Sequence, residues 1–362
     1  MKNKQSLIAV GGLLAVALVV VIRNYRAGDA VSPRAANGVV EERVPVPSRG
    51  KINPMPRLPA PRFKARQRPA VPAQAPETPE LSREMLEKHL TDTRRSVASL
   101  LAVSRITKDL ALLDEAKRKD PGNPQVLLDW ILRSAATPEE KKQALDEFRK
   151  AVPDNAVGDY LFALQQFEAG DVDGAVTALW QASQQPAADA YFMNALRDAE
   201  EAYIGAGYPP LQALMEAAMG MENHVLGRFR QLSDWTLDMQ AAYAADGDAE
   251  SARTIALTGS GMGAAMLRQF EHGTVVDQVS AINYERKFLE LLDPAVELVA
   301  GGPTAGARLD ELNALRDQIK SALEATVLRD HLDESAMMEY YQQVKLKGEV
   351  GALLGLQQMK KP

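Results

Sequence analysis

Four histidines, one glycine-rich cluster and a few acidic pairs are the residues of this chain whose types could do chemistry. His89, His224, His272 and His331 stand far apart in the sequence, and none has a second ligand at a metal-binding spacing such as His-Glu-x-x-His. The chain has no cysteine, which excludes disulfides, thiolate metal ligands and cysteine nucleophiles. We therefore expect no metal, no cofactor and no catalytic residue.

The glycine-rich cluster at 259–263, Gly-Ser-Gly-Met-Gly, does not have the context of a phosphate-binding loop. No strand precedes it, and neither a lysine nor a dinucleotide-binding pattern follows it, so a close helix contact or a turn is the better interpretation. Acidic pairs such as Glu200/Glu201 and Asp333/Glu334 are typical of solvated helix faces. The three tryptophans, Trp130, Trp180 and Trp235, are predicted to pack in the core.

Charge divides the 362 residues into a basic arm and an acidic body. Residues 1–80 carry 13 Lys/Arg against 5 Asp/Glu, and residues 81–362 carry 29 against 43. Nucleic-acid binding needs clustered positive charge, so the acidic body disfavours a nucleic-acid partner. The basic arm alone could contact an anionic lipid or polymer.

The apolar run from Leu7 to Ile22 predicts an N-terminal membrane anchor within residues 1–26. Its 16 residues contain no charge, and as a helix they span ~24 Å, a minimal transmembrane length. A cleaved signal peptide is the competing interpretation, but the first small-x-small triplet lies beyond Arg23 and Arg26. The flanking charges give conflicting signals for orientation, and we expect the body to lie outside the cytoplasm.

Residues 27–80 are predicted to be a disordered linker rich in proline and arginine. Eleven of the 21 prolines fall here, and proline prevents both helices and central strands from persisting. The sharpest local feature is a basic cluster for which contact with a polyanion or a membrane surface competes with a simple solubilising role. The cluster consists of Arg57, Arg62, Lys64, Arg66 and Arg68.

Residues 81–362 are predicted to be entirely helical. Good helix formers dominate, and short proline- and glycine-containing breaks at 120–124, 152–155, 207–210, 245–248 and 301–306 separate the helical stretches. Thr137, Pro138 and Glu140 form a helix-start signal. A division of this body near 207–222 is a further possibility.

The helix ends share a pattern in which a large apolar residue precedes a small one by three positions. The pairs are Leu113/Ala116, Phe148/Ala151 and Leu179/Ala182, with the alanines 35 and 31 residues apart. In this respect the chain resembles the tetratricopeptide repeat, most clearly over 125–187. The resemblance implies a helical-hairpin α-solenoid or an irregular helical array. It assigns Ala163, Ala175 and Ala182 to close helix crossings.

In tetratricopeptide repeats the first helix of each pair lines a concave groove. On the best-matching repeat that resemblance points to a partner-binding set, in which an exposed aromatic residue would be a contact and a buried one would be core. The set consists of Tyr160, Leu164, Phe167 and Glu168. The sequence does not indicate the oligomeric state or the identity of a partner.

Taken together, these features predict a membrane-anchored, non-enzymatic scaffold or adaptor for protein–protein interaction. Two alternatives remain open at this point. One is a structural envelope component whose basic linker grips a polyanion. The other is an enzyme whose site is assembled from scattered acidic residues that form no motif.

Overall fold

The structure is a computed structural model, and it describes residues 81–185, 187–220, 222–329 and 331–359. Within these ranges the regular structure is α-helix, with only two isolated β-bridges, Asn155–Ala187 and Glu297–Thr304. The prediction of an all-α fold is therefore confirmed for the described residues. The predicted membrane anchor and proline-rich linker lie outside them.

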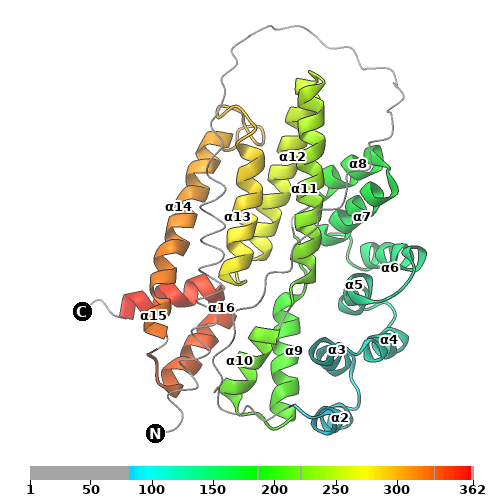
Figure 1. Cartoon of the computed structure of the whole chain (residues 1–362), viewed down its shortest axis with the longest axis vertical. Coiled ribbons are helices and arrows are strands. Elements are labelled where there is room, and N and C mark those ends of the chain that lie inside the picture. The colour runs from blue at the N-terminus through cyan, green and yellow to red at the C-terminus, as the bar shows by residue number, and fades with distance from the viewer. Residues whose placement is uncertain (1–80, 186, 221, 330, 360–362) are drawn as a thin grey trace, which may run out of the picture. The chain divides into compact units, whose positions relative to one another are not determined.

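The first helices form a run of short elements that we call the hairpin series (Figure 1). Each helix from α2 to α7 packs on the next one along the chain. The breaks predicted at 120–124 and 152–155 separate α4 from α5 and α6 from α7. The series consists of α2 (Arg83–Asp92), α3 (Val97–Thr107), α4 (Leu110–Lys119), α5 (Pro124–Arg133), α6 (Pro138–Ala151), α7 (Ala156–Ala169) and α8 (Val172–Ser183).

Local side-chain caps explain why these short helices begin where they do. Thr137 accepts a hydrogen bond from the backbone N–H of Glu140, whose carboxylate accepts one from the Thr137 N–H at 2.8 Å, so the predicted start signal is a complete capping box. The Asn123 and Asp171 side chains each accept hydrogen bonds from backbone N–H groups in the first turn and so cap α5 and α8. At the end of α7, Gly170 takes the left-handed conformation (φ 78°) that closes the helix.

The remaining helices, which we call the covering helices, lie against one side of the hairpin series (Figure 1). Helix α9 packs on α2 and α3, α11 on α7, and α12 on α8. The covering helices are α9 (Phe192–Gly205), α10 (Pro210–Gly220), α11 (His224–Ala245), α12 (Ala249–Gln269), α13 (Val275–Leu289), α14 (Ala305–Glu324), α15 (Thr326–Arg329) and α16 (Glu334–Met359). Helix α10 lies in the stretch where the sequence suggested a division.

One large hydrophobic cluster joins both groups of helices. Its members come from every helix of the hairpin series and include Phe229 of α11, Met262 of α12 and Phe288 of α13, each at most 1% exposed. A second, smaller cluster around Tyr203 and Tyr208 joins α9 to α10 and the turn between them. The covering helices therefore complete the core that the hairpin series begins.

The glycines at 259–263 lie inside α12 and provide its close contact with α13. A Cβ atom on Gly263 would lie 2.5 Å from the Glu285 Cα, and one on Gly259 would clash with the Phe288 ring. The interpretation of this cluster as a close helix contact is confirmed. Next to it, Glu285 forms a two-armed ion pair with Arg308 of α14, with Nε–Oε1 and Nη2–Oε2 distances of 2.6 and 3.0 Å.

Helix α16 bends sharply at Gly348, whose φ of 71° only glycine adopts readily. The Glu349 N–H donates to the Gly273 carbonyl at 3.2 Å, and its carboxylate accepts from the Val275 N–H at 2.9 Å. The bend thus fixes the last part of α16 against the start of α13. Among the described helices, none is both long and apolar enough to cross a membrane.

Candidate functional site

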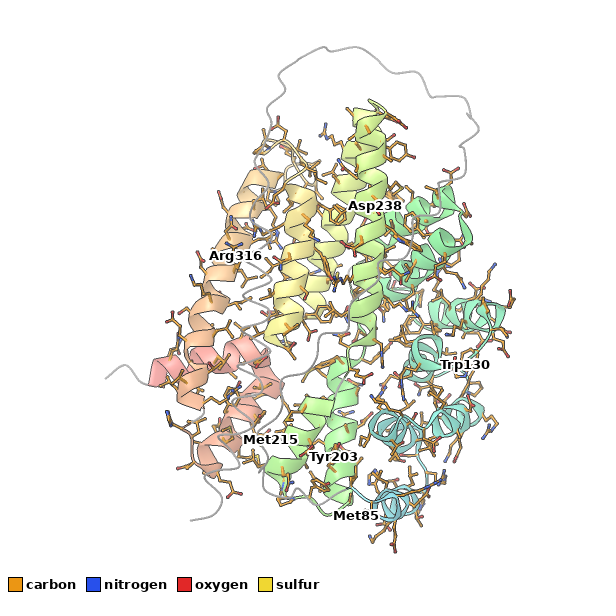
Figure 2. All side chains as sticks on the ribbon, in the orientation of Figure 1. Met85, Trp130, Tyr203, Met215, Asp238 and Arg316 are labelled. Carbon is orange, nitrogen blue, oxygen red and sulfur yellow. The ribbon has the colours of Figure 1, made fainter. Side chains whose placement is uncertain are left out.

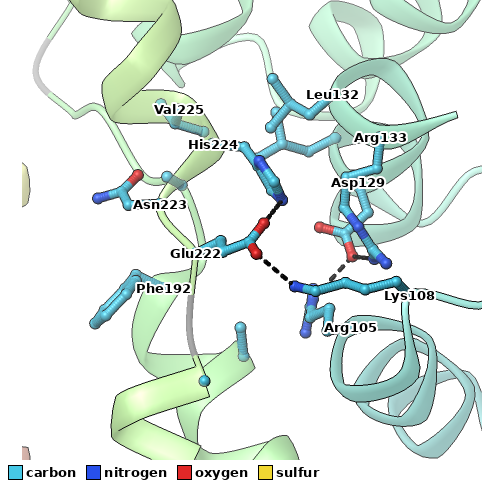
Figure 3. Close-up of a pocket in the computed structure, with 14 residues that line it drawn as sticks. Arg105, Lys108, Asp129, Leu132, Arg133, Phe192, Glu222, Asn223, His224 and Val225 are labelled. Carbon is cyan, nitrogen blue, oxygen red and sulfur yellow. Dashed lines mark hydrogen bonds and ion pairs between the residues drawn. The ribbon is translucent and has the colours of Figure 1, made fainter. Parts of the chain in front are cut away.

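A small charged recess opens where the covering helices join the hairpin series (Figure 3). Helices α3 and α5 form one side, and the start of α9 and the turn between α10 and α11 form the other. Its volume is about 60 Å³, which is room for a few water molecules. The charged side chains that line it are Arg105, Lys108, Asp129, Arg133, Glu222 and His224.

Asp129 of α5 is the centre of the buried half of the recess. Its Oδ2 lies 2.8 Å from the Arg105 Nε and 3.1 Å from the Arg133 Nη1, and all three side chains are at most 14% exposed. Arg133 also donates to the Ser104 carbonyl at 2.8 Å. Because the Asp129 carboxylate pairs with a guanidinium group from each helix, α3 and α5 are held together by a buried ionic contact.

Glu222 is the centre of the exposed half. Its two oxygens lie 3.0 Å from the Lys108 Nζ and 3.2 Å from the His224 Nε2, so it bridges α3 and the first residue of α11 (Figure 3). The hydrogen bond from Lys108 holds the pKa of Glu222 below its usual value. Burial lowers the pKa of His224, and the Glu222 carboxylate partly opposes this effect.

A third carboxylate, Asp198 of α9, is buried outside the lining of the recess, and its Oδ1 lies 3.8 Å from the Arg197 Nη2. Burial raises its pKa, while the charges of Arg105 and Arg197 lower it. Within the recess itself, the carboxylates of Asp129 and Glu222 face three permanent cations and one histidine. In the described part of the chain there is no group of three or more His, Cys, Asp or Glu side chains that could hold a metal ion. The recess is best suited to fixing the α10–α11 turn against the hairpin series.

The four residues predicted to bind a partner all lie on α7 but differ in their exposure to solvent. Tyr160 and Leu164 are 0% and 4% exposed, and the Tyr160 ring meets the Phe229 ring of α11 edge-on at 5.3 Å. Phe167 is partly buried against Trp235 of α11. By the criterion set for aromatic residues, Tyr160 belongs to the core, because α11 covers this face of α7.

Glu168 alone of the four is exposed, and its Oε1 lies 3.4 Å from the Gln231 Nε2. Partner binding at this set stays a prediction. The second predicted set, the basic cluster of the linker, lies outside the described residues, as does the apolar run from Leu7 to Ile22. That set consists of Arg57, Arg62, Lys64, Arg66 and Arg68.

The tryptophans differ from the sequence-based expectation. Trp130 is 9% exposed, and its indole N–H donates to Asp114 at 3.2 Å; Figure 2 shows it among the helices of the hairpin series. Trp180 on α8, however, is 56% exposed, so the prediction that all three tryptophans pack in the core is wrong. The expectation that the acidic pair Glu200/Glu201 lies on a solvated helix face also fails for Glu200. Its side chain is 12% exposed and pairs with Lys345 of α16 at 3.0 Å.

Sequence reasoning did not identify the recess because its charged groups come from stretches that are far apart in the chain. Arg133 stands at the ordinary i,i+4 spacing from Asp129, but the pairs of Asp129 with Arg105 and of Glu222 with Lys108 follow no common spacing. A usable signal was the position of His224 directly after Glu222 and the helix-capping Asn223, next to a helix start. No protein-family model, curated protein or solved structure matches this chain.

Proposed function

We propose that the chain is a membrane-anchored, non-enzymatic scaffold or adaptor whose helical body binds a protein partner. The observation that carries this proposal is Trp180, a large aromatic side chain that remains more than half exposed. Tryptophan is enriched among the residues that dominate protein–protein binding energies, and its exposure to water is otherwise unfavourable.

The position of Trp180 supports a docking role. Helix α8 is the last of the hairpin series, and it packs on α7 and α12. The side chains of Asp173, Thr177, Trp180 and Gln184 follow one another at helical spacing and are all exposed. A stack of helical hairpins leaves such a face at its end, where either a polar cap or a partner must cover it.

The amino-terminal part of the proposal rests on sequence alone. The apolar run from Leu7 to Ile22 suits an anchor, and the proline-rich residues 27–80 suit a spacer. The resemblance of 125–187 to the tetratricopeptide repeat, a family whose members present peptide-binding surfaces, supports the same function. Both features remain part of the proposal.

Site-specific photo-crosslinking in native membranes tests this function. A photoreactive residue at Thr177 in the full-length chain should capture a specific protein, and Trp180→Ala should reduce its yield about tenfold, as expected for the loss of a binding hot spot. Leu346→Ala removes a side chain of α16 that is 67% exposed and serves as the matched control. Equal yields from both variants, or no crosslinked protein at all, would argue against the proposal.

A further inference from the structure

A second concave surface lies at the far end of α11 and α12 from the recess. It is a groove of about 880 Å³ between the α11–α12 turn and the loop 290–304 that joins α13 to α14. Figure 1 shows this turn and this loop at the same end of the covering helices. Small side chains make up much of the lining, so an extended backbone can approach closely. They are Ala244, Gly247, Ala249, Ala252, Ala295 and Ala300.

Gln240 gives the groove an unused pair of hydrogen-bonding groups. This side chain of α11 lines the groove, is only 9% exposed, and makes no hydrogen bond to any described residue. The Gln240 amide is not among the unpaired side-chain groups that are fully sealed from water, so its donors and acceptor are open to a ligand in the groove. An amide offers one acceptor and two donors, which match the N–H and C=O groups of an extended peptide.

The charges around the groove are predominantly negative. Among the described residues, Asp293 and Glu297 line it, against the single cation Arg253. The stretch 231–252, which runs through the α11–α12 turn, contains five Asp/Glu and no Lys or Arg. A basic ligand is therefore favoured electrostatically over a neutral or acidic one.

Two of these carboxylates are held in place by their own backbone. The Asp293 Oδ1 accepts from the Ala295 N–H at 2.9 Å, and the Glu297 Oε2 accepts from the Gly301 N–H at 3.0 Å. Each therefore keeps one oxygen for an external donor while its position stays fixed. Fixed carboxylates lose less side-chain freedom on binding a cation than mobile ones do.

We propose that this groove binds an extended, Lys/Arg-bearing segment of a partner protein. The ligand backbone pairs with the Gln240 amide, its small side chains lie along the alanines, and its basic side chains meet Asp293 and Glu297. The groove is a separate site from the exposed face of α8 that carries Trp180, so this inference goes beyond the function proposed above. It rests on that function only because it also takes a protein as the ligand.

Fluorescence anisotropy with the full-length chain in detergent micelles tests the groove. The probe is a fluorescein-labelled peptide in which arginine alternates with valine, and the same peptide with glutamate in place of arginine is the counter-probe. We expect saturable binding of the arginine peptide only. Gln240→Met, which keeps the side-chain length and removes the amide, should weaken binding about tenfold.

Two variants that lose the same charge distinguish binding in the groove from general electrostatic attraction to the acidic body. Asp293→Asn with Glu297→Gln keeps both backbone hydrogen bonds and removes two charges, and should weaken binding about tenfold. Glu139→Gln with Asp154→Asn removes the same charge at exposed positions of the hairpin series and should change affinity less than about twofold.

Three results would overturn the proposal. They are equal weakening by the two charge variants, unchanged binding by both Gln240→Met and the groove charge variant, and sedimentation showing that a second copy of the chain occupies the groove. Crosslinking through Thr177 is an independent readout. A Trp180-dependent partner together with failed peptide binding would refute the groove alone, and the reverse result would refute the function proposed for α8.

Discussion

The hairpin series and the covering helices are built from the same kinds of residues but are held together differently. From α2 to α8 each helix packs on its neighbour in the sequence, and side-chain caps mark the helix starts. Most of the covering helices are longer, and several pack on helices far away in the chain, as α9 does on α3 and α12 on α8. Side-chain caps also begin α11, α12, α13 and α14, and these four helices pack on one another in chain order. Local signals therefore act in both groups, and contacts between distant helices join the covering helices to the hairpin series.

Two arginine–glutamate pairs show the contrast within a single type of contact. Arg95 and Glu115 in the hairpin series form the same two-armed ion pair as Arg308 and Glu285 in the covering helices. The first pair is about one-third exposed, while the Glu285 side chain is 2% exposed. In both pairs the carboxylate raises the pKa of the arginine, but only in the second would loss of the arginine leave a buried charge.

The largest expected effect comes from breaking these pairs in parallel. Arg308→Met should lower the free energy of unfolding by about 3 kcal/mol, because the Glu285 carboxylate loses its partner in a buried site. Arg95→Met should cost at most about 1 kcal/mol, since water can solvate Glu115. Urea denaturation measures both. Equal losses would show that burial does not distinguish the two groups of helices.

The glycine contact between α12 and α13 gives the next effect. Gly263→Ala should destabilise the protein by about 1–3 kcal/mol, because the new Cβ would meet the backbone of Glu285. Gly227→Ala in α11, where a Cβ would meet no atom within 4 Å, should instead stabilise by about 0.5–1 kcal/mol through better helix propensity. Thermal unfolding of both variants provides the comparison, and a stabilised Gly263→Ala protein would contradict the close contact.

A pH dependence should appear where the two groups of helices meet. Burial lowers the pKa values of His89 on α2 and His224 on α11 below 6.5. As the pH falls, the unfolded chain therefore binds protons before the folded one, so the free energy of unfolding should decrease from about pH 7 to 6. His89→Gln and His224→Gln should each flatten this slope, measured by urea denaturation at several pH values. Slopes that match the parent protein would exclude these histidines as the cause.

The smallest expected effect is at Tyr160, where α11 covers α7. Its hydroxyl is buried with no hydrogen-bond partner among the described residues, and burial raises its pKa. Tyr160→Phe should therefore leave stability unchanged or raise it by up to about 1 kcal/mol. A loss of more than that amount, in the same denaturation assay, would show that the hydroxyl has a partner.

The sequence predicted features that depend on neighbours along the chain. The Thr137–Glu140 capping box and the close approach at Gly263 were both recognisable from residue type and spacing. The burial of Tyr160 could not be recognised from the sequence. It depends on contact with Phe229, which is 69 residues away and follows no repeat spacing. The same reason hid the recess, whose charges converge only after α9 and α11 fold back.

The exposed Trp180 has a consequence for spectroscopy. The chain contains three tryptophans, and Trp180 is the one that water reaches most easily, since Trp130 is 9% exposed and Trp235 is partly buried. Emission from Trp180 should be red-shifted and selectively quenched by iodide. The Trp180→Phe difference spectrum would then provide a label-free optical reporter of any molecule that settles on the outer face of α8.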